Sequence, residues 1–347
     1  MINIKKHLIS ISLTLMIFSC IDPRSNDLWS ISILAVLDTE GFARDAKIAK
    51  NHAFVAAGQS GIQIWDLDSK NRVSNFTGYE EGGTFLEFDD LGLIGIDTLN
   101  NLIFSTETNK DVKIFHYPNF DSIEYRNTIM SARTKEFISF SKIYGEFFMF
   151  AADNDDGIKW HRYNLDTTSA FGINFIEWTP FGGGEIYTPG KPEGIDSDGD
   201  THIALAVDQM GVELYSMDSL GSNPTLIGII GTEGNAEKVR LVSDGVFASC
   251  DDAGAYFIPL DSFNSSENKS IRFAMDFTVD HISVNKQESI VAVSLGTRGI
   301  ALYDISDKEN PIERGVFSIG YVYKTMFWKN NLVVCSREGI QLIEIDN

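Results

Sequence analysis

The stretch HAFVAAGQSGIQIWDLD, residues 52–68, combines an apolar run, a short polar loop that ends in glycine, and a second apolar run that closes on aspartate. A closely similar stretch, SIVAVSLGTRGIALYDISD, returns at residues 289–307. The apolar runs are rich in β-branched and aromatic residues, and the tight polar loop between them is typical of a β-hairpin. The number of such hairpins in the chain therefore decides the fold.

Seven copies of the hairpin align on the residue that ends the polar loop. These anchor residues are Gly61, Asp111, Gly157, Gly211, Gly254, Gly299 and Gly339. Their spacing of 40 to 54 residues is typical of propeller and solenoid repeats. One more apolar strand precedes each hairpin and another follows it. We therefore predict an all-β protein, a seven-bladed β-propeller of four-stranded antiparallel blades.

The two ends of the chain predict how the ring closes. The seventh repeat stops at Asn347 after its third strand, whereas WSISILAVLDTEG, residues 29–41, contains a strand that belongs to no repeat of its own. We expect this N-terminal strand to complete the last blade, because closure would remove two open sheet edges. The predicted domain is a single β-propeller over residues 29–347.

Residues 1–19 are predicted to be a lipoprotein signal peptide. Basic MINIKK is followed by apolar HLISISLTLMIF, which is too short to span a bilayer stably. The sequence IFSC, residues 17–20, resembles the lipobox of bacterial lipoproteins, which implies attachment of fatty acids such as palmitate at Cys20. Residues 20–28 would then be a lipidated tether. The alternative is an ordinary signal peptide cut near Ser19.

The composition narrows the partners and the compartment. There are 28 Lys and Arg residues against 49 Asp and Glu residues, a net charge of -21. Such a surface repels polyanions, so we predict no nucleic-acid partner. Besides Cys20, the chain contains Cys250 and Cys335, which occupy the same place in their repeats. We expect two buried free thiols rather than a disulfide.

Several copies also resemble a known family. The sequences GIQIWDLD, GIALYDISDKENP and GIQLIEID are similar to the repeats of the LVIVD-repeat family, and the likeness covers residues 29–347. The resemblance implies an exported bacterial β-propeller. Together with the lipobox-like sequence, it predicts a lipid anchor at the cell envelope, on the outer membrane or the cell surface. It implies little about function, since one fold serves many functions.

Charged residues near the starts of the predicted inner strands are candidates for a ligand site in the central channel. They are Arg44, Lys135, Glu136, Glu193, Lys238, Arg240, His281 and Lys324. Their mixed signs suit a polar ligand, and they equally suit a solvated channel mouth.

The largest departure from the repeat is an insertion over residues 175–194, FIEWTPFGGGEIYTPGKPEG. A loop of this length in a compact domain is typically functional or disordered. Trp178, Phe181 and Tyr187, beside flexible glycines, are predicted to form a lid or an aromatic platform for a sugar or peptide. The alternative is a loop that packs its aromatic side chains onto the rim.

Acidic residues recur in the hairpin loops of the middle blades. We expect Asp153, Asp155, Asp156, Asp251 and Asp252 to form an acidic arc that could bind Ca²⁺, which prefers oxygen ligands. Aspartate is equally common as a turn residue. The stretch IDSDGD, residues 195–200, fails as an EF-hand because Val207 occupies the twelfth position, and Asp198-Gly199 predicts a hairpin turn instead. No other cofactor is predicted.

Three functional classes remain open. The first is a binding or scaffold module for a protein or glycan partner at the cell envelope. The second is a hydrolase or lyase that acts on a glycan, with Glu136 and Glu193 as acid and base. The third is a structural protein without a small ligand. The sequence contains no linear catalytic motif, which favours the first class but does not exclude an enzyme.

Overall fold

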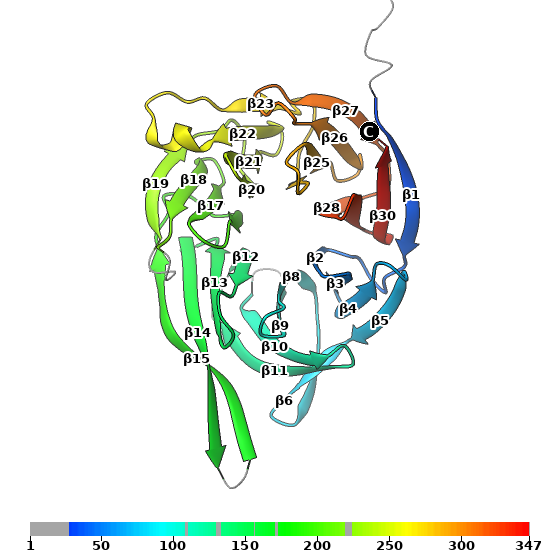
Figure 1. Ribbon diagram of the computed structural model, residues 1–347, viewed down its shortest axis with the longest axis vertical. Coiled ribbons are helices and arrows are strands. Elements are labelled where there is room, and N and C mark those ends of the chain that lie inside the picture. Colours follow the sequence, from blue (N-terminus) through cyan, green and yellow to red (C-terminus); the bar gives the residue numbers. More distant parts are fainter. Residues whose placement is uncertain are drawn as a thin grey trace, which may run out of the picture.

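Seven four-stranded sheets stand around a central channel (Figure 1). The computed structural model describes residues 28–107, 110–129, 133–155, 157–170, 173–218 and 224–346. Neighbouring strands in every sheet are antiparallel, as in Asp45↔Ala56 of the first blade and His281↔Ser294 of the sixth. The predicted seven-bladed β-propeller is confirmed.

Each blade contributes its first strand to the channel, and its other strands follow outward. The inner strands are β2 (Asp45–Ala49), β8 (Leu91–Asp97), β12 (Thr134–Phe140), β16 (Gly194–Ser197), β20 (Lys238–Val242), β24 (His281–Val284) and β28 (Val322–Trp328). The second strands are β3 (His52–Ala56), β9 (Leu102–Glu107), β13 (Glu146–Asp153), β17 (His202–Val207), β21 (Gly245–Ser249), β25 (Ile290–Ser294) and β29 (Asn331–Ser336).

The third strands are β4 (Ile62–Asp66), β10 (Val112–Asn119), β14 (Gly157–Ala170), β18 (Gly211–Ser216), β22 (Ala255–Pro259), β26 (Ile300–Asp304) and β30 (Gly339–Asp346). The outer strands are β5 (Asn71–Phe76), β11 (Ser122–Ile129), β15 (Ile173–Ile186), β19 (Thr225–Ile230), β23 (Ile271–Phe273), β27 (Ile312–Phe317) and β1 (Ser30–Leu37). A small hairpin, β6 (Gly78–Glu81) and β7 (Thr84–Glu87), and a 3-10 helix, η2 (Leu260–Asn264), lie between these strands in the sequence.

The glycine that ends the polar loop is required by the geometry of the hairpin. Gly61 has φ +82°, and a Cβ at this position would lie 2.0 Å from the carbonyl oxygen of Phe76. Gly299 repeats this arrangement, with φ +88° and 2.1 Å to the carbonyl oxygen of Phe317. Since a side chain would be both strained and in collision, the repeated glycine is an architectural feature.

The N-terminal strand closes the ring. β1 pairs with β30 over their full lengths, from Ser30↔Asp346 to Leu37↔Ile340. β1 is therefore the outer strand of the blade formed by β28, β29 and β30, as the sequence predicted. The pairing joins the two ends of the described chain, and it covers the edge that β30 would otherwise expose.

The core consists of apolar clusters between neighbouring blades. Phe54 and Ile64 of the first blade, for example, pack with Ile94 and Phe115 of the second. Cys250 and Cys335 are buried free thiols in two such clusters, which confirms the prediction for these residues. Burial raises the pKa of the Cys250 thiol to about 12, so it remains protonated and behaves as a small apolar side chain.

The interpretation of residues 175–194 as a loop insertion was wrong for residues 175–186. Residues 175–186 belong to β15, which pairs with β14 from Ile158↔Ile186 to Ala170↔Ile173. Figure 1 shows these two strands extending as a hairpin beyond the ring. The glycines that suggested flexibility lie opposite bulky residues of β14, as in Trp160↔Gly184, and leave room for their side chains.

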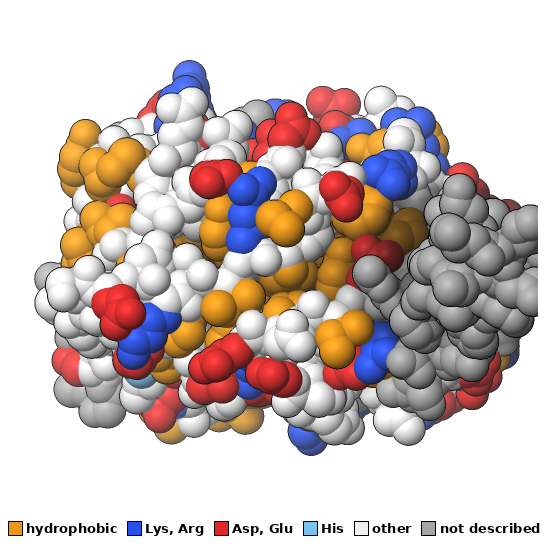
Figure 2. All heavy atoms as spheres, turned by 90° about the horizontal axis from the view of Figure 1, so that it is seen from above, with side chains coloured by type: hydrophobic (Ala, Val, Ile, Leu, Met, Phe, Trp, Pro, Cys, Tyr) orange, Lys and Arg blue, Asp and Glu red, His pale blue; other side chains and the backbone are white. Residues whose placement is uncertain are grey.

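The outer rim carries both signs of charge. Figure 2 shows acidic and basic side chains interspersed among apolar ones on the side of the ring that it displays. Exposed apolar residues on outer strands include Ile33 and Val36 of β1 and Ile312 and Val316 of β27. None of the helices in the described part of the chain is long and apolar enough to cross a bilayer.

Candidate functional site

A cavity of about 610 Å³ lies in the central channel, within the size range of small-molecule sites. Its walls come from the inner strands β2, β12, β16, β20, β24 and β28, so six of the seven blades contribute. Its mouth is formed by the turns that follow β24 and β28, with Asn285, Lys286, Gln287, Lys329 and Asn330.

The repeated register of the blades places equivalent side chains at the same level of the channel. At the first level, each residue pairs with the last or last but one residue of the second strand. These residues are Asp45, Leu93, Glu136, Gly194, Lys238, His281 and Lys324. Two residues further along each inner strand, the second level contains Lys47, Gly95, Ile138, Asp196, Arg240, Ser283 and Met326.

An ion-pair network crosses the channel at the first level. Lys324 Nζ lies 2.6 Å from Asp45 Oδ1 and 3.9 Å from Glu136 Oε1, and Lys238 Nζ lies 3.2 Å from Glu136 Oε2. Burial opposes the charge, but Asp45 and Glu136 raise the pKa of Lys324 above its usual value. The ammonium therefore stays charged, and the network joins the first, third, fifth and seventh blades.

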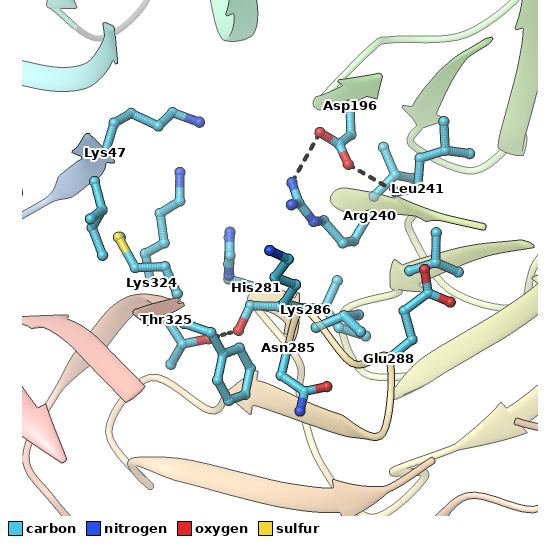
Figure 3. A pocket seen from close by; sticks show the side chains of 18 of the residues that line it. Lys47, Asp196, Arg240, Leu241, His281, Asn285, Lys286, Glu288, Lys324 and Thr325 are labelled. Carbon is cyan, nitrogen blue, oxygen red and sulfur yellow. Dashed lines mark hydrogen bonds and ion pairs between the residues drawn. The ribbon is translucent and has the colours of Figure 1, made fainter. Parts of the chain in front are cut away.

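The second level contains one ion pair and one further cation. Arg240 Nη1 lies 3.2 Å from Asp196 Oδ1, while Asp196 Oδ2 accepts a hydrogen bond from the backbone N–H of Leu241. Within the described chain, the Lys47 ammonium has neither an ion pair nor a hydrogen bond. Figure 3 shows Lys47 and Lys324 extending into the cavity from β2 and β28. Repulsion by Lys324, together with burial, lowers the pKa of Lys47.

His281 faces the same group of cations. Burial lowers its pKa well below the usual value, and Lys324, Lys238, Lys47 and Arg240 add to the effect, so the ring is neutral at pH 7. Its Nδ1 is buried and has no hydrogen-bond partner in the part of the chain that the structure describes. A neutral imidazole has one donor and one acceptor nitrogen, so His281 retains unused hydrogen-bonding capacity.

The cavity is locally cationic in an anionic protein. The structure describes all the residues of the two levels. Their charged side chains are four cations, Lys47, Lys238, Arg240 and Lys324, and three carboxylates, Asp45, Glu136 and Asp196. The whole chain, in contrast, has a net charge of -21. The charge that remains after pairing is that of Lys47.

The candidate channel residues divide between the cavity and the opposite end of the channel. Glu136, Arg240, His281 and Lys324 line the cavity, and Lys238 contacts it through Glu136. The other three form ion pairs near the starts of the inner strands. Arg44 lies 2.9 Å from Asp90, and Lys135 lies 3.2 Å from Glu193.

Asp45 and Lys47 were missed by reasoning from the sequence. Both lie on β2, at the positions that Lys238 and Arg240 occupy on β20. Alignment of the inner strands, as well as the hairpins, would have indicated them. Asp196 was considered only as a calcium ligand, and in the structure it pairs with Arg240.

The three aromatic candidates do not form a platform. Trp178 is only 4% exposed and packs on Phe147, with ring centroids 5.0 Å apart. The guanidinium carbon of Arg162 lies 4.2 Å from the centroid of the Phe181 ring. Tyr187 is 81% exposed. None of the three lines the cavity. The prediction was wrong because β15 is the outer strand of its blade, on the far side of the sheet from the channel.

Three of the acidic loop residues have partners within the protein. Asp153 accepts hydrogen bonds from the backbone N–H groups of Arg133 and Asp155, and Asp252 accepts one from Thr278 Oγ1. Asp155 forms an ion pair with Arg133. Burial and Asp252 raise the pKa of Asp251. Asp156 lies outside the described residues.

No set of three or more His, Cys, Asp or Glu side chains is arranged to hold a metal ion in the described ranges. Calcium binding therefore stays a prediction. The expected turn at Asp198-Gly199 is confirmed, since Asp198 accepts hydrogen bonds from the backbone N–H groups of Asp200, Thr201 and His202. Partial burial opposes ionisation, but these hydrogen bonds hold the pKa of Asp198 well below its usual value.

Similarity to solved structures is extensive in shape and slight in sequence. A structure of U3-55K has a TM-score of 0.67 at 11% identity, over 93% of this chain and 99% of that one. The structure of the RRP9 WD40 repeats has a TM-score of 0.66 at 11% identity, over 93% of this chain and 98% of that one. The structure of a computationally designed protein has a TM-score of 0.59 at 12% identity, over 90% of this chain and 99% of that one. At this identity the likeness shows the fold alone.

No family model and no curated protein matches the sequence.

Proposed function

We propose that this chain is an exported bacterial lipoprotein whose propeller acts as a binding module at the cell envelope. The observation that carries the binding role is the channel cavity, where unused polar groups from different blades converge beside apolar walls. This combination is typical of ligand sites. The signal-like residues 1–19 and the lipobox-like IFSC sequence support export and a lipid on Cys20. The likeness of the repeats to the LVIVD family agrees with this role.

The hydrolase or lyase alternative receives less support. Glu136 is shared between Lys238 and Lys324, and Glu193 contacts Lys135 and the side-chain amide of Asn154. Both carboxylates are therefore engaged within the protein, whereas a glycosidase pair must face the sugar between them.

Metabolic labelling tests the anchor. The full chain, produced in a bacterium that is fed radiolabelled palmitate, should incorporate label and remain with the membrane fraction. A Cys20→Ala variant should lose the label and leave the membrane, because the acyl chains provide the attachment. Cys250→Ala is the matched control and should label normally, since that thiol is buried. Label that persists in Cys20→Ala would contradict the lipoprotein assignment.

A further inference from the structure

Among the cations at the two channel levels, Lys47 is the one that has no counter-charge among the described residues. Its neighbour Lys324 is engaged by Asp45 and Glu136, and Arg240 is engaged by Asp196. An unpaired ammonium in a partly buried site is costly, and a bound counter-ion removes that cost. The cavity therefore has the electrostatic character of an anion-binding site.

We infer that the cavity binds a small organic anion, with its carboxylate or phosphate group between Lys47, Lys324 and His281. This assignment rests on the binding role proposed above and specifies the class of ligand.

Hydrogen-bonding capacity is available around this position. The Lys47 ammonium offers three donors, and Lys324 retains donors beyond those directed at Asp45 and Glu136. The buried Nδ1 of His281 can donate to the same group in one neutral tautomer. Hydrogen bonds from ammonium groups to an oxyanion are among the stronger ones in proteins.

The other residues that line the cavity indicate the chemical character of the rest of the ligand. Ile48, Ile138, Val284 and Phe327 supply apolar wall, and Asn285 and Gln287 place amide groups at the mouth. A ligand that has an anionic group and a body with both apolar carbon atoms and hydroxyl groups would match the apolar wall and the amide groups. A sugar acid or a sugar phosphate has this character, and the volume of about 610 Å³ accommodates a molecule of that size.

The two ends of the channel favour access from one side. Lys286 lies at the cavity mouth. At the opposite end carboxyl groups gather, since Asp251 lies close enough to Glu237 and to Asp280 to interact with both. An anion would be repelled at this acidic end. It would therefore enter through the mouth that Lys286 lines.

Calorimetric titration of the full chain in detergent tests the assignment with three probes that differ in charge. They are galacturonate, galactose 6-phosphate and uncharged galactose. We expect at least one anion to bind much more tightly than galactose, and the stronger anion identifies carboxylate or phosphate as the preferred head group. Lys47→Gln should weaken this binding about tenfold or more, since it removes a charge-assisted hydrogen bond. Lys191→Gln removes an exposed positive charge outside the cavity and should leave the binding unchanged.

A thermal melt of each variant separates loss of binding from loss of folding. Lys47→Gln should melt no lower than the parent protein, because an unpaired and partly buried charge has been removed. Equal affinity for galactose and galacturonate would overturn the anion assignment and leave the binding role intact. Absence of anion binding up to about 10 mM, or anion affinity that is unchanged in Lys47→Gln, would also overturn it. The palmitate experiment decides the anchor independently.

Discussion

Single ionisable residues differ sharply between the two ends of the channel. At the end where the inner strands begin, Glu237 is partly buried and Asp280 is exposed, and Asp251 lies close enough to both to disfavour their charge. At the cavity end, burial and the surrounding cations lower the pKa of His281, and repulsion by Lys324 together with burial lowers the pKa of Lys47. The surroundings of each of these groups thus disfavour its charged form. Such shifted pKa values are characteristic of functional sites, where a group changes its protonation state or binds a ligand of opposite charge.

Glu237→Gln should raise the stability of the protein at neutral pH. Burial, and then Glu193, raise the pKa of Glu237 in the folded protein, so the folded state holds this proton more tightly than the unfolded state. The contribution of Glu237 to stability is therefore greatest at acidic pH and is lost as the pH rises through the folded-state pKa. The variant avoids that loss. Its melting temperature should exceed that of the parent at pH 7 to 8, and the difference should shrink as the pH falls toward about 4.

Glu309→Gln is the matched control, since this glutamate is exposed. Its substitution should change the melting temperature little at any of these pH values. A Glu237→Gln protein that melts below the parent at pH 8 would contradict the assignment of a buried, repelled carboxylate.

The β14–β15 hairpin is the element that distinguishes the third blade from the others. Its strands are each 14 residues long, against three to eight residues for the outer strands of the other blades. The base of the hairpin is part of the blade, where Trp178 packs on Phe147 and its carbonyl accepts a hydrogen bond from Asn127 on β11. Trp178 thus joins the second and third blades at the rim.

Trp178→Ala should destabilise the protein without affecting the cavity. Loss of a buried tryptophan from an apolar cluster costs about 3 to 5 kcal/mol, measurable by denaturant unfolding. Tyr187→Ala alters an exposed residue after the same strand and should change stability by less than about 0.5 kcal/mol. A Trp178→Ala protein of normal stability with lost sugar binding would restore the platform hypothesis.

For the whole molecule, two different devices hold the ring together. β1 and β30 close it at the rim by backbone pairing. In the channel, Glu136 lies between Lys238 and Lys324, and Lys324 also contacts Asp45, so charges from four blades meet across the axis. The packing between neighbouring blades is mainly apolar, whereas Glu136 connects its own blade to two blades that are not its neighbours.

Glu136→Gln should destabilise the ring because it leaves two lysines with less compensation. Removal of one partner from a largely buried ion-pair network costs on the order of 3 kcal/mol, measurable as a reduced free energy of unfolding. Glu233→Gln interrupts an exposed ion pair with Arg272 and should cost less than about 1 kcal/mol. Equal effects of the two substitutions would show that the channel network contributes no more than a surface pair.

The architecture was predictable from the sequence because its determinants are local and repeated. Gly61 and Gly299 are required by a hairpin turn that involves few residues, and the same turn recurs along the chain. The alternation of apolar residues in a strand and the residue types in a turn depend on residues that are close in the chain. Both can therefore be recognised in a single sequence. The closing strand was predictable for the same reason, since one strand lacked a blade and one blade lacked a strand.

The candidate site was predictable only in part. Reasoning from the sequence identified Glu136, Arg240, His281 and Lys324, because residues at the starts of the inner strands must border the channel. It could not indicate which charges pair, since the partners lie on different blades, as Lys324 and Asp45 do. It also assigned Trp178 and Phe181 to a loop, because a long strand with several glycines resembles one.

The sequence by itself thus determined the repeat, the number of blades and the closure of the ring, all of which follow from short-range turn and strand chemistry. The tertiary structure decided where Trp178 lies, which carboxylates the channel lysines use, and that Lys47 has no partner among the described residues. These features depend on distances between blades, and such distances exist only after the ring has formed.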